Sequence, residues 1–561
     1  MKIKTKNKFT ATGILVATFL LAACSPQEES MSPAEVGIIE DTVQEVQVTP
    51  EAGDTAASGS VPGTTAEDAI AAVAEAMGGE ERIMQVRNVT LMGYAHYAYQ
   101  DGGGNITALP NAPQKYIQAN DLRRIYDLEN NRYYQQERNN DLFPFAIYRG
   151  HDFALQRQIL DGSLDGDIAY SLNEAGLASR RSAADVRNLR MWMHTNPLVA
   201  VRAALESDDR VGNRREEGGL TLVDITLDSD DELTLAIRPP MNLPAWIRWV
   251  TPQQNLGEVT YTTHYTGFIP YEGVYLPLGY NTKQDWRDVE YFKMWVDGYY
   301  LDTEIEDLSA PQEVLAQEIP GGFDPDSLEV EAVARGIWRI TGGTMVIEFA
   351  DHMTLYEVGG GIDRVKAVVA LARTIVPEKP VTEVIVSHHH FDHTRGLRQA
   401  IAEGLTVISR RNNGVIFEEM ASHPAPNFPD DLERNGETLE FIPVDDSMVL
   451  EDDSMRVELY HTINNNHTAD NLFAYVPEHN MIIEADVATA AEDLQWWGDS
   501  WLDNIEYRNL EVDINVPVHM EVMSYQEVID MVNPGIQRVK DWCAEHEAEE
   551  NYFPGCPAFL R

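Results

Sequence analysis

Seven consecutive residues, Ser387–His393, hold four imidazoles and one carboxylate. Protonated histidines repel one another, so such a cluster is costly to hold together, and histidine-rich tracts are typical of metal sites. The alternative is an accidental polar run, or histidines satisfied inside the core. The order His388-x-His390-x-Asp392-His393 favours two pairs of metal ligands over that alternative.

The segments on either side of this run must position it. Val381–Val386 is apolar and β-branched, which predicts a buried strand that ends just before the histidines. His388 and His390 are two residues apart, so an extended backbone projects both side chains to one side. Gly396–Ala402 predicts a helix, and the second ligand pair falls where the chain turns into it. Two ligand pairs therefore emerge from the C-terminal end of one strand, close enough to hold two metal ions.

Three candidate ligands farther along the chain also follow apolar, strand-like segments. His467 comes after Met455–Tyr460, and Asp486 ends a predicted pair of strands. His519 closes the apolar run Ile514–Val518. Each of these three elements is weak alone. Together with the run His388–His393 they form a series of four ligand elements, and a strand-like segment precedes each one.

Together these motifs resemble the metallo-β-lactamase-fold hydrolase superfamily, whose hallmark is His-x-His-x-Asp-His on a strand-to-helix loop. The resemblance implies two metal ions and seven ligands: His388, His390 and His467 on the first ion, Asp392, His393 and His519 on the second, and Asp486 bridging both. His461 also precedes a threonine and is the alternative third ligand of the first ion. His467 is preferred because Asp470-Asn471 follows it, as in the family pattern. His519 stands in Val-His-Met, where the family usually has a Gly-His-Gly-like turn.

The ligand types also bear on the metal and on the branch of the superfamily. Imidazoles with carboxylates suit zinc, with iron and manganese as alternatives, so two Zn²⁺ ions are the expected cofactors. The di-iron branch typically has Glu at the position of His390 and carries a flavin domain. The β-lactamases proper have Cys, or no carboxylate, at the position of Asp486. The carboxylate here therefore resembles lactonases, hydroxyacylglutathione hydrolases and phosphodiesterases of this fold.

We expect a zinc-dependent hydrolase that uses a hydroxide bound to the two metals to cleave a carboxylic ester, lactone or amide of an apolar small molecule. Asp392 is the expected catalytic residue, because its carboxylate can orient that hydroxide. The alternatives are a phosphodiesterase or sulfatase on the same fold, and a lipoprotein that binds metal without catalysis. Trp496, Trp497 and Trp501 favour an apolar or aromatic substrate near the site, although such clusters are as often part of the core.

The N-terminus predicts export. Residues 1–23 combine a lysine-rich start with the apolar Gly13–Leu21, as a signal peptide does. Leu21-Ala-Ala-Cys24 resembles the bacterial lipoprotein processing site, which implies lipid attachment to Cys24, and Ser25 favours the outer membrane. The alternative is an ordinary cleaved signal with an incidental cysteine. The chain is then a lipoprotein that contacts the membrane through its lipid anchor only.

Composition divides the rest of the chain. Residues 24–65 form an acidic tether without aromatic residues, which cannot bury enough apolar surface to order itself. Residues 66–315 combine a helix at Ala66–Met77, alternating strand-like segments and a helical interruption at 183–205, which predicts a mainly antiparallel β domain. This domain either binds an apolar substrate and shapes the mouth of the site, or is a packing module. The resemblance implies an α/β fold for residues 326–545, an αββα metallo-β-lactamase sandwich, with a C-terminal tail at 546–561.

The net charge bears on the partners of the protein, and the cysteines bear on its covalent links. The formal net charge of −49 disfavours nucleic acid and anionic surfaces, which leaves a small-molecule substrate as the expected partner. Cys543 and Cys556 are the cysteines beyond the predicted anchor. In an exported protein they are expected to form a disulfide, with two free thiols or a third metal site as the alternatives.

Overall fold

The computed structural model describes residues 61–100, 107–112, 114–141, 155–164, 166–206, 208–465, 467–488 and 498–546. All of them belong to one compact unit, Ala57–Arg561. The predicted signal peptide with Cys24, and also Trp496, Trp497 and Cys556, lie outside the described residues. Within the described ranges, no helix combines the length and the apolar character needed to cross a membrane.

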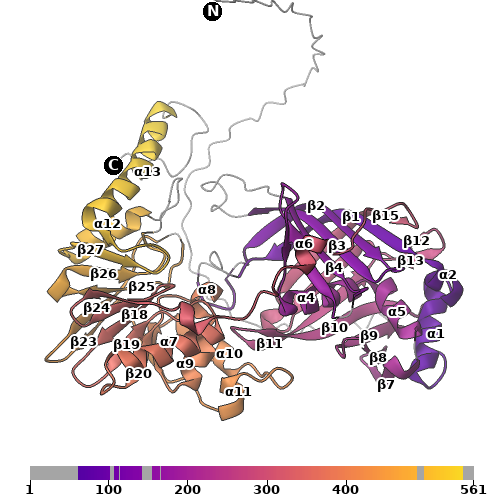
Figure 1. Cartoon of the computed structure of the whole chain (residues 1–561), viewed down its shortest axis with the longest axis horizontal. Helices are drawn as coiled ribbons and strands as arrows, with labels where there is room; N and C mark the ends of the chain where they lie inside the picture. Colours follow the sequence, from indigo (N-terminus) through magenta and orange to yellow (C-terminus); the bar gives the residue numbers. More distant parts are fainter. Residues whose placement is uncertain are drawn as a thin grey trace, which may run out of the picture. The chain divides into compact units, whose positions relative to one another are not determined.

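The first region corresponds to the predicted β domain of residues 66–315 (Figure 1). It is built on a 13-stranded antiparallel sheet with the order β6-β5-β4-β3-β2-β1-β15-β14-β11-β10-β9-β8-β7. Its strands are β1 (Asn88–Ala98), β2 (Tyr116–Asp127), β3 (Arg132–Asp141), β4 (Leu155–Asp161), β5 (Ile168–Leu172), β6 (Ala178–Arg180), β7 (Val211–Glu217), β8 (Leu220–Thr226), β9 (Glu232–Arg238), β10 (Leu243–Gln253), β11 (Gly257–Thr266), β14 (Gly279–Gln284) and β15 (Glu290–Leu301). A separate hairpin pairs β12 (Ile269–Tyr271) with β13 (Val274–Leu276). The mainly antiparallel architecture expected for this region is therefore present.

Helices cover part of this sheet. They are α1 (Ala66–Met77), α2 (Glu80–Gln85), α4 (Ala183–His194), α5 (Pro197–Leu205) and α6 (Gln312–Leu315), with short 3₁₀ turns η1 (Asp208–Arg210), η2 (Trp286–Asp288) and η3 (Pro325–Ser327). A capping box between Thr65 and Asp68 fixes the start of α1, because each side chain accepts a hydrogen bond from the other's backbone N–H. Val61 is already buried, so the packed structure begins a few residues before the predicted end of the tether.

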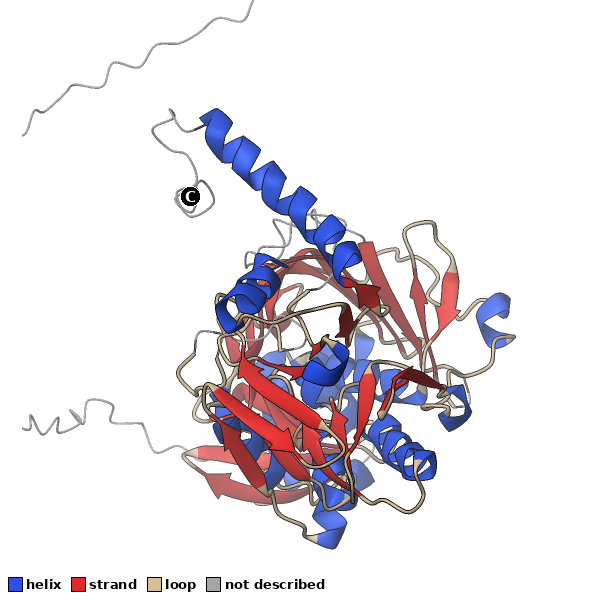
Figure 2. Cartoon of the chain, turned by 90° about the vertical axis from the view of Figure 1, so that its left-hand side faces the viewer, coloured by secondary structure: helices blue, strands red, loops and turns tan. Residues whose placement is uncertain are grey.

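The second region corresponds to the predicted sandwich of residues 326–545 and consists of two sheets (Figure 2). The first sheet contains β16 (Val330–Ala334), β17 (Ile337–Ile340), β18 (Thr344–Glu348), β19 (Met353–Tyr356), β20 (Val381–Ile385), β21 (Thr406–Arg410) and β22 (Phe441–Val444). The second contains β23 (Ser447–Glu451), β24 (Arg456–His461), β25 (Leu472–Val476), β26 (Met481–Glu484), β27 (Ile514–Pro517) and β28 (Met523–Ser524). Buried aliphatic side chains from both sheets form one cluster between them.

Helices lie on the outer faces of this sandwich. They are α7 (Ile362–Ile375), α8 (Phe391–Thr394), α9 (Leu397–Ala402), α10 (Asn413–Ser422), α11 (Asp431–Asn435), α12 (Gly498–Arg508) and α13 (Tyr525–His546), with the 3₁₀ turn η4 (Pro477–His479). Residues of α12 and α13 pack against β25 and β26. The apolar faces of α7, α9 and α10 belong to the same buried cluster as the core of the first region. The structure confirms the αββα sandwich that the sequence predicted.

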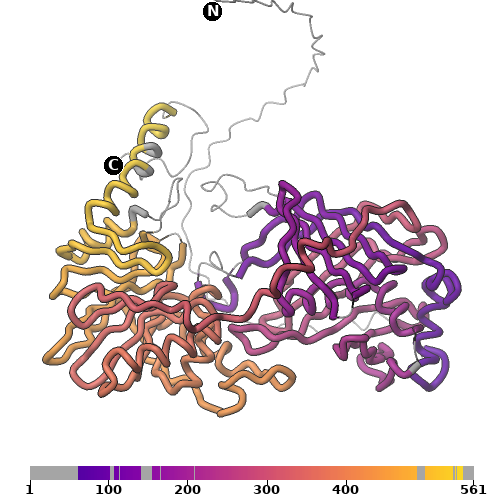
Figure 3. The backbone as a smooth tube through the Cα atoms, in the orientation of Figure 1, coloured from indigo at the N-terminus to yellow at the C-terminus, as the bar shows by residue number. Residues whose placement is uncertain are grey.

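The sheet topology brings distant segments to one edge. The strands β19, β20, β21 and β22 pair in parallel, and so do β26 and β27. Polar loops at the carboxyl ends of parallel strands meet at one edge of a sheet. The loops after β20, β24, β26 and β27 carry the candidate ligands, within the part of the chain that Figure 3 colours from red-orange to yellow.

Candidate metal centre

Four side chains predicted as ligands of the first metal converge at the edge of the sandwich. His388 Nε2 lies 3.1 Å from His390 Nδ1, which lies 3.0 Å from His467 Nε2. Asp486 Oδ2 is 3.0 Å from His467 Nε2 and 3.5 Å from His388 Nε2. The four ligand atoms lie within 4.8 Å of one another, and all four residues are buried.

A second group shares Asp486 with the first. His393 Nε2 lies 2.9 Å from Asp486 Oδ2 and 3.0 Å from His519 Nε2. Asp392 Oδ2 lies 3.5 Å from His393 Nε2 and 3.9 Å from His519 Nε2. The side chains of Asp392 and His519 are 25% and 43% exposed, so this group opens toward solvent. The structure thus brings together all seven residues that the sequence singled out.

The donor set fits a pair of divalent cations. Ring nitrogens about 3 Å apart, with carboxylate oxygens beside them, form the mixed imidazole and carboxylate environment that zinc, iron and manganese accept. Each group offers four such atoms, and Oδ2 of Asp486 faces both groups while its Oδ1 faces His519. His388, His390, His467 and Asp486 would hold one ion, while Asp392, His393 and His519 would hold the other together with Asp486.

The electrostatics of the cluster also favour bound cations. Burial, together with the neighbouring imidazoles, holds the pKa of His388 well below its ordinary value. Burial disfavours a charge on His393 as well, but three surrounding carboxylates raise the pKa of His393 well above its usual range. Burial likewise opposes the charge on Asp486, yet the imidazoles of His467 and His393 hold the pKa of that carboxyl well below normal. The centre therefore keeps its carboxylate charged and attracts positive charge.

Glu357 is a functional residue that sequence reasoning missed. It follows β19, is 1% exposed, and its Oε2 lies 2.9 Å from Nδ1 of His393. Its other oxygen accepts a hydrogen bond of 2.8 Å from the backbone N–H of Ser387. The carboxylate therefore fixes the tautomer of His393, so that Nε2 faces the centre, as carboxylates behind metal-bound histidines do. An acidic residue at the end of the buried Met353–Tyr356 strand was the available signal.

Two further polar side chains hold the ligand loops. Asn465 accepts a hydrogen bond of 2.7 Å from the backbone N–H of His467 and donates one of 3.2 Å to the carbonyl of Asp486. Asp486 itself has a φ of 56°, a left-handed conformation that is uncommon for residues other than glycine. Glu484 accepts the N–H groups of the next turn, and its burial raises its pKa to about 7. Asp486 is thus held in a strained turn that several hydrogen bonds stabilise.

The first region also contacts the ligand-bearing helix α8. The side-chain nitrogen of Asn255, in the turn between β10 and β11, donates to the carbonyl of Phe391 at 2.9 Å and to Oγ1 of Thr394 at 2.8 Å. The N–H of Phe391 donates to the carbonyl of Gln100 at 3.2 Å. Nothing in the sequence marked Asn255 or Gln100, because a contact between residues more than a hundred positions apart leaves no local pattern.

Other residues considered from the sequence lie elsewhere. The Nε2 of His461, the alternative third ligand, is 2.7 Å from the carbonyl of Ala469 and outside both ligand groups. Trp501 belongs to the core, where its Nε1 donates to Asn515 at 3.0 Å and its ring packs on Tyr525. Cys543 is buried and disulfide-bonded, while its predicted partner Cys556 falls outside the described residues.

Comparison with known proteins identifies the second region. Residues 344–519 match the family model of the Metallo-beta-lactamase superfamily. No curated protein matches the chain in sequence. Among solved structures, a metallo-beta-lactamase from Pontibacter korlensis is 14% identical, with a TM-score of 0.30, over 38% of this chain and 99% of its own. FIM-1 from Pseudomonas aeruginosa, in its mono-zinc form, is 14% identical with a TM-score of 0.30, over 38% of this chain and 95% of its own.

A metallo-beta-lactamase from Hirschia baltica is 14% identical with a TM-score of 0.28, over 36% of this chain and 94% of its own. At such TM-scores the assignment rests on the matched family model and not on these structures. Within the matched residues lie both ligand groups, from His388 to His519. Residues 344–519 therefore match the Metallo-beta-lactamase superfamily, and with their His/Asp cluster they support a metal-dependent hydrolase in general.

Proposed function

We propose that this protein is a zinc-dependent hydrolase that holds two Zn²⁺ ions and cleaves a carboxylic ester, lactone or amide of an apolar small molecule. The observation that carries the proposal is the position of Asp486. One of its oxygens lies 3.0 Å from His467 Nε2 and 2.9 Å from His393 Nε2, between the two ligand groups. A carboxylate shared in this way supports a dinuclear centre of the kind that hydrolyses esters and lactones.

Bound zinc would lower the pKa of water from about 15.7 to roughly 7 and polarise a carbonyl oxygen of the substrate. The protein supplies the geometry for that chemistry. Ser387 Oγ lies 2.9 Å from Nδ1 of His388, and Glu357 faces Nδ1 of His393, so the Nε2 atoms of both rings point into the centre. Preorganised ligands of this kind need no rearrangement during the reaction.

Asp392 is the residue proposed to handle the proton. It is the more exposed of the two carboxylates in the second group, so its oxygens are within reach of a water molecule in the open part of the site. We propose that Asp392 accepts a hydrogen bond from the attacking water, orients it toward the substrate carbonyl and takes its proton at Oδ. We propose that the same carboxyl group then returns this proton to the departing alkoxide or amine.

We further propose that the protein acts outside the cytoplasm as a lipoprotein, anchored to the outer membrane through Cys24. The Leu21-Ala-Ala-Cys24 pattern after an apolar segment supports this location. The net charge of −49 supports a small-molecule partner over nucleic acid. Labelling of cells with a radioactive fatty acid tests the anchor: wild type should take up label, and Cys24→Ala should not.

Metal analysis combined with a substrate panel tests the catalytic proposal. Purified protein should contain two zinc ions per chain, and His388→Ala should lose most of them, whereas His461→Ala should keep them. p-Nitrophenyl esters, a lactone, nitrocefin and bis-p-nitrophenyl phosphate separate the substrate classes. Turnover of the esters or lactone, abolished in His388→Ala, is the expected result. Turnover of the phosphodiester alone, or metal content unchanged by His388→Ala, would contradict the proposal.

A further inference from the structure

Two buried polar side chains of helix α12 hold loops that carry proposed metal ligands. Trp501 and Asn504 are 1% and 2% exposed. Trp501 packs in a cluster with side chains of β25 and β26 and with Val487, the residue after Asp486. A buried indole N–H or amide is costly unless it has hydrogen-bond partners, so the partners of these two side chains show what α12 stabilises.

The amide of Asn504 pairs with the backbone of Ile463 in both directions. Its oxygen accepts the N–H of Ile463 at 2.9 Å, and its nitrogen donates to the carbonyl of Ile463 at 2.9 Å. The nitrogen also donates to the carbonyl of Ser500 at 2.6 Å, which ties the amide to its own helix. Two bonds to one residue fix its orientation as well as its position. Asn504 therefore holds the start of the loop that leads to His467.

The next residues of that loop continue the connection to the ligand. Asn464 has a φ of 55°, a left-handed conformation that asparagine adopts more readily than most residues with a Cβ. Its side-chain nitrogen donates to Asp503 of α12 at 2.9 Å. Asn465, which follows it, accepts the backbone N–H of His467 at 2.7 Å. Bonds from α12 thus support a strained turn directly before the ligand.

A second set of hydrogen bonds runs from α12 to the turn of Asp486. An indole N–H can only donate, so Trp501 Nε1, 3.0 Å from Asn515 Oδ1, fixes which end of that amide is the acceptor. The amide nitrogen of Asn515 then donates to Glu484 Oε1 at 3.0 Å. The other oxygen of Glu484 accepts the backbone N–H of Val487 at 2.9 Å. Trp501 therefore acts on both sides of Asp486 through two buried side chains.

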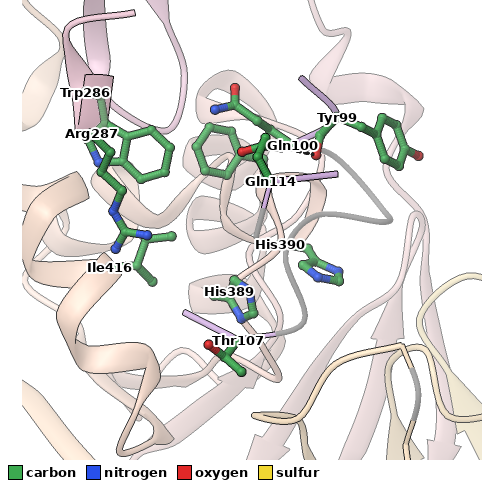
Figure 4. Close-up of a pocket in the computed structure, with 10 residues that line it drawn as sticks. Tyr99, Gln100, Thr107, Gln114, Trp286, Arg287, His389, His390 and Ile416 are labelled. Carbon is green, nitrogen blue, oxygen red and sulfur yellow. Dashed lines mark hydrogen bonds between the residues drawn. The ribbon is translucent and has the colours of Figure 1, made fainter. Parts of the chain in front are cut away.

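Another ligand of the first group, His390, has different surroundings. It lines a pocket together with Gln100 and Gln114 of the first region (Figure 4). Among the described residues around that pocket, none belongs to α12. The contacts of α12 are thus directed at two of the proposed ligands, His467 and Asp486, and not at the whole cluster.

We propose that α12 positions the metal ligands His467 and Asp486, and that Asn504 and Trp501 are the positioning residues. This inference rests on the proposed metal centre. Each side chain acts through the backbone of a ligand loop, by the bonds to Ile463 and, through Asn515 and Glu484, to the turn of Asp486. Residues behind the ligands set how closely the donor atoms match the geometry of an ion, and their loss typically weakens binding by about 10- to 100-fold.

Zinc affinity of the full chain tests the role of Asn504. Asn504→Leu keeps the size of the side chain and removes both bonds to Ile463. We expect zinc affinity to fall at least about tenfold, measured by competition with a chromogenic chelator. Asn88→Leu is the control, because Asn88 is also buried and donates to a backbone carbonyl, that of Thr303, in the first region. It should bind zinc like wild type. Wild-type zinc affinity in Asn504→Leu would overturn the proposal.

The visible absorption spectrum of the Co²⁺-loaded chain tests the role of Trp501, because it reports the arrangement of ligands around the ion. Trp501→Phe removes the indole N–H but keeps an aromatic ring, and we expect it to change the spectrum. Trp249→Phe is the matched control. Trp249 is also 1% exposed, and its Nε1 has no hydrogen-bond partner among the described residues. This variant should give the wild-type spectrum.

The spectra separate positioning from packing and from the proposed function. A wild-type spectrum in Trp501→Phe, with only a lower free energy of unfolding, would show that α12 merely packs against the sheet. The same comparison decides the proposal should Asn504→Leu not fold. If wild type binds neither zinc nor cobalt, the proposed metal centre fails, and the role of α12 fails with it. If wild type binds both metals but hydrolyses no ester, the substrate proposal fails, while the spectra still decide the role of α12.

Discussion

Glu357 Oε2 and Nδ1 of His393 lie 2.9 Å apart, and both side chains are almost completely buried. This pair links the first sheet to the second ligand group, because Glu357 follows β19 and His393 belongs to α8. A carboxylate in this position orients the imidazole and increases its basicity toward a metal.

Replacing Glu357 should therefore weaken metal binding without removing a ligand. Glu357→Gln presents an N–H to His393 in place of an oxygen, or reverses the amide and loses the bond from Ser387. We expect the affinity for zinc to fall by about 10- to 100-fold, measured by competition with a chromogenic chelator. Glu383→Gln, on β20 and partly exposed, is the control and should bind zinc like wild type. Wild-type affinity in Glu357→Gln would argue against an orienting role.

Asn255 should matter for both stability and the metal centre. Its amide satisfies the carbonyl of Phe391 and meets Thr394 Oγ1, and the loss of a buried donor leaves the carbonyl unpaired. Asn255→Ala should lower the free energy of unfolding by about 1–3 kcal/mol. It should also weaken zinc binding about tenfold, because α8 carries two of the proposed ligands. Chemical denaturation and zinc competition measure the two effects.

Asn435→Ala is the appropriate control for that experiment. Its side chain also donates to a backbone carbonyl, that of Ala402, but it is exposed and distant in sequence from the ligand loops. This variant should change the unfolding free energy by about 0.5 kcal/mol or less, with zinc affinity intact. A loss of zinc affinity in Asn255→Ala that is no greater than in Asn435→Ala would show that Asn255 only stabilises the fold.

Removal of metal should destabilise the second region. The proposed ligands come from four separate loops, so bound ions would add links between segments that packing and hydrogen bonds such as those of Asn465 also hold. Free zinc at 100 times its dissociation constant stabilises a folded protein by about 2.7 kcal/mol. Dialysis against a chelator should therefore lower the melting temperature, and re-addition of zinc should restore it. His467→Ala should melt near the temperature of the chelated wild type, with little response to chelator.

Acid should destabilise the first region through His194. Burial lowers the pKa of His194 to about 4 from an ordinary 6.5, although its hydrogen bond with the backbone of Arg190 opposes the shift. Between these values the unfolded chain binds a proton that the folded chain does not, so stability is complete above about pH 6.5 and declines as the pH falls toward 4. The shift corresponds to about 3 kcal/mol. His194→Gln should flatten this part of the pH profile, measured by urea unfolding, whereas the surface variant His479→Gln should leave it as in wild type.

The sequence predicted the parts of this molecule that depend on local pattern. The run His388–His393 after an apolar strand, and the helix Ala66–Met77 with its acidic first turn, are defined by neighbouring residues. Glu357 and Asn255 could not be predicted in the same way. Their roles depend on side chains that the folded sheets bring next to α8, and the pairing of β1 with β15 across two hundred residues is equally invisible in local composition.

Trp501 is another residue whose place in the fold could not be decided from the local sequence. Its position after Asp486 suggested an aromatic wall beside the site, with the core as the alternative. The start of α12 turns it toward Asn515 and Tyr525, beneath the second sheet. The tryptophan that packs beside the ligand-bearing helix α8 is instead Trp286, whose ring lies 5.4 Å from that of Phe391.

The buried cluster shared by the core of the first region and helices α7, α9 and α10 determines how this protein can be divided. A fragment that begins near residue 326 would retain every proposed ligand and the whole matched family segment. It would nevertheless expose the apolar faces of those three helices to water, and such large exposed patches promote aggregation. The smallest piece expected to be soluble is therefore the span from residue 61 to residue 546. The first region cannot be removed without exposing the apolar faces of α7, α9 and α10.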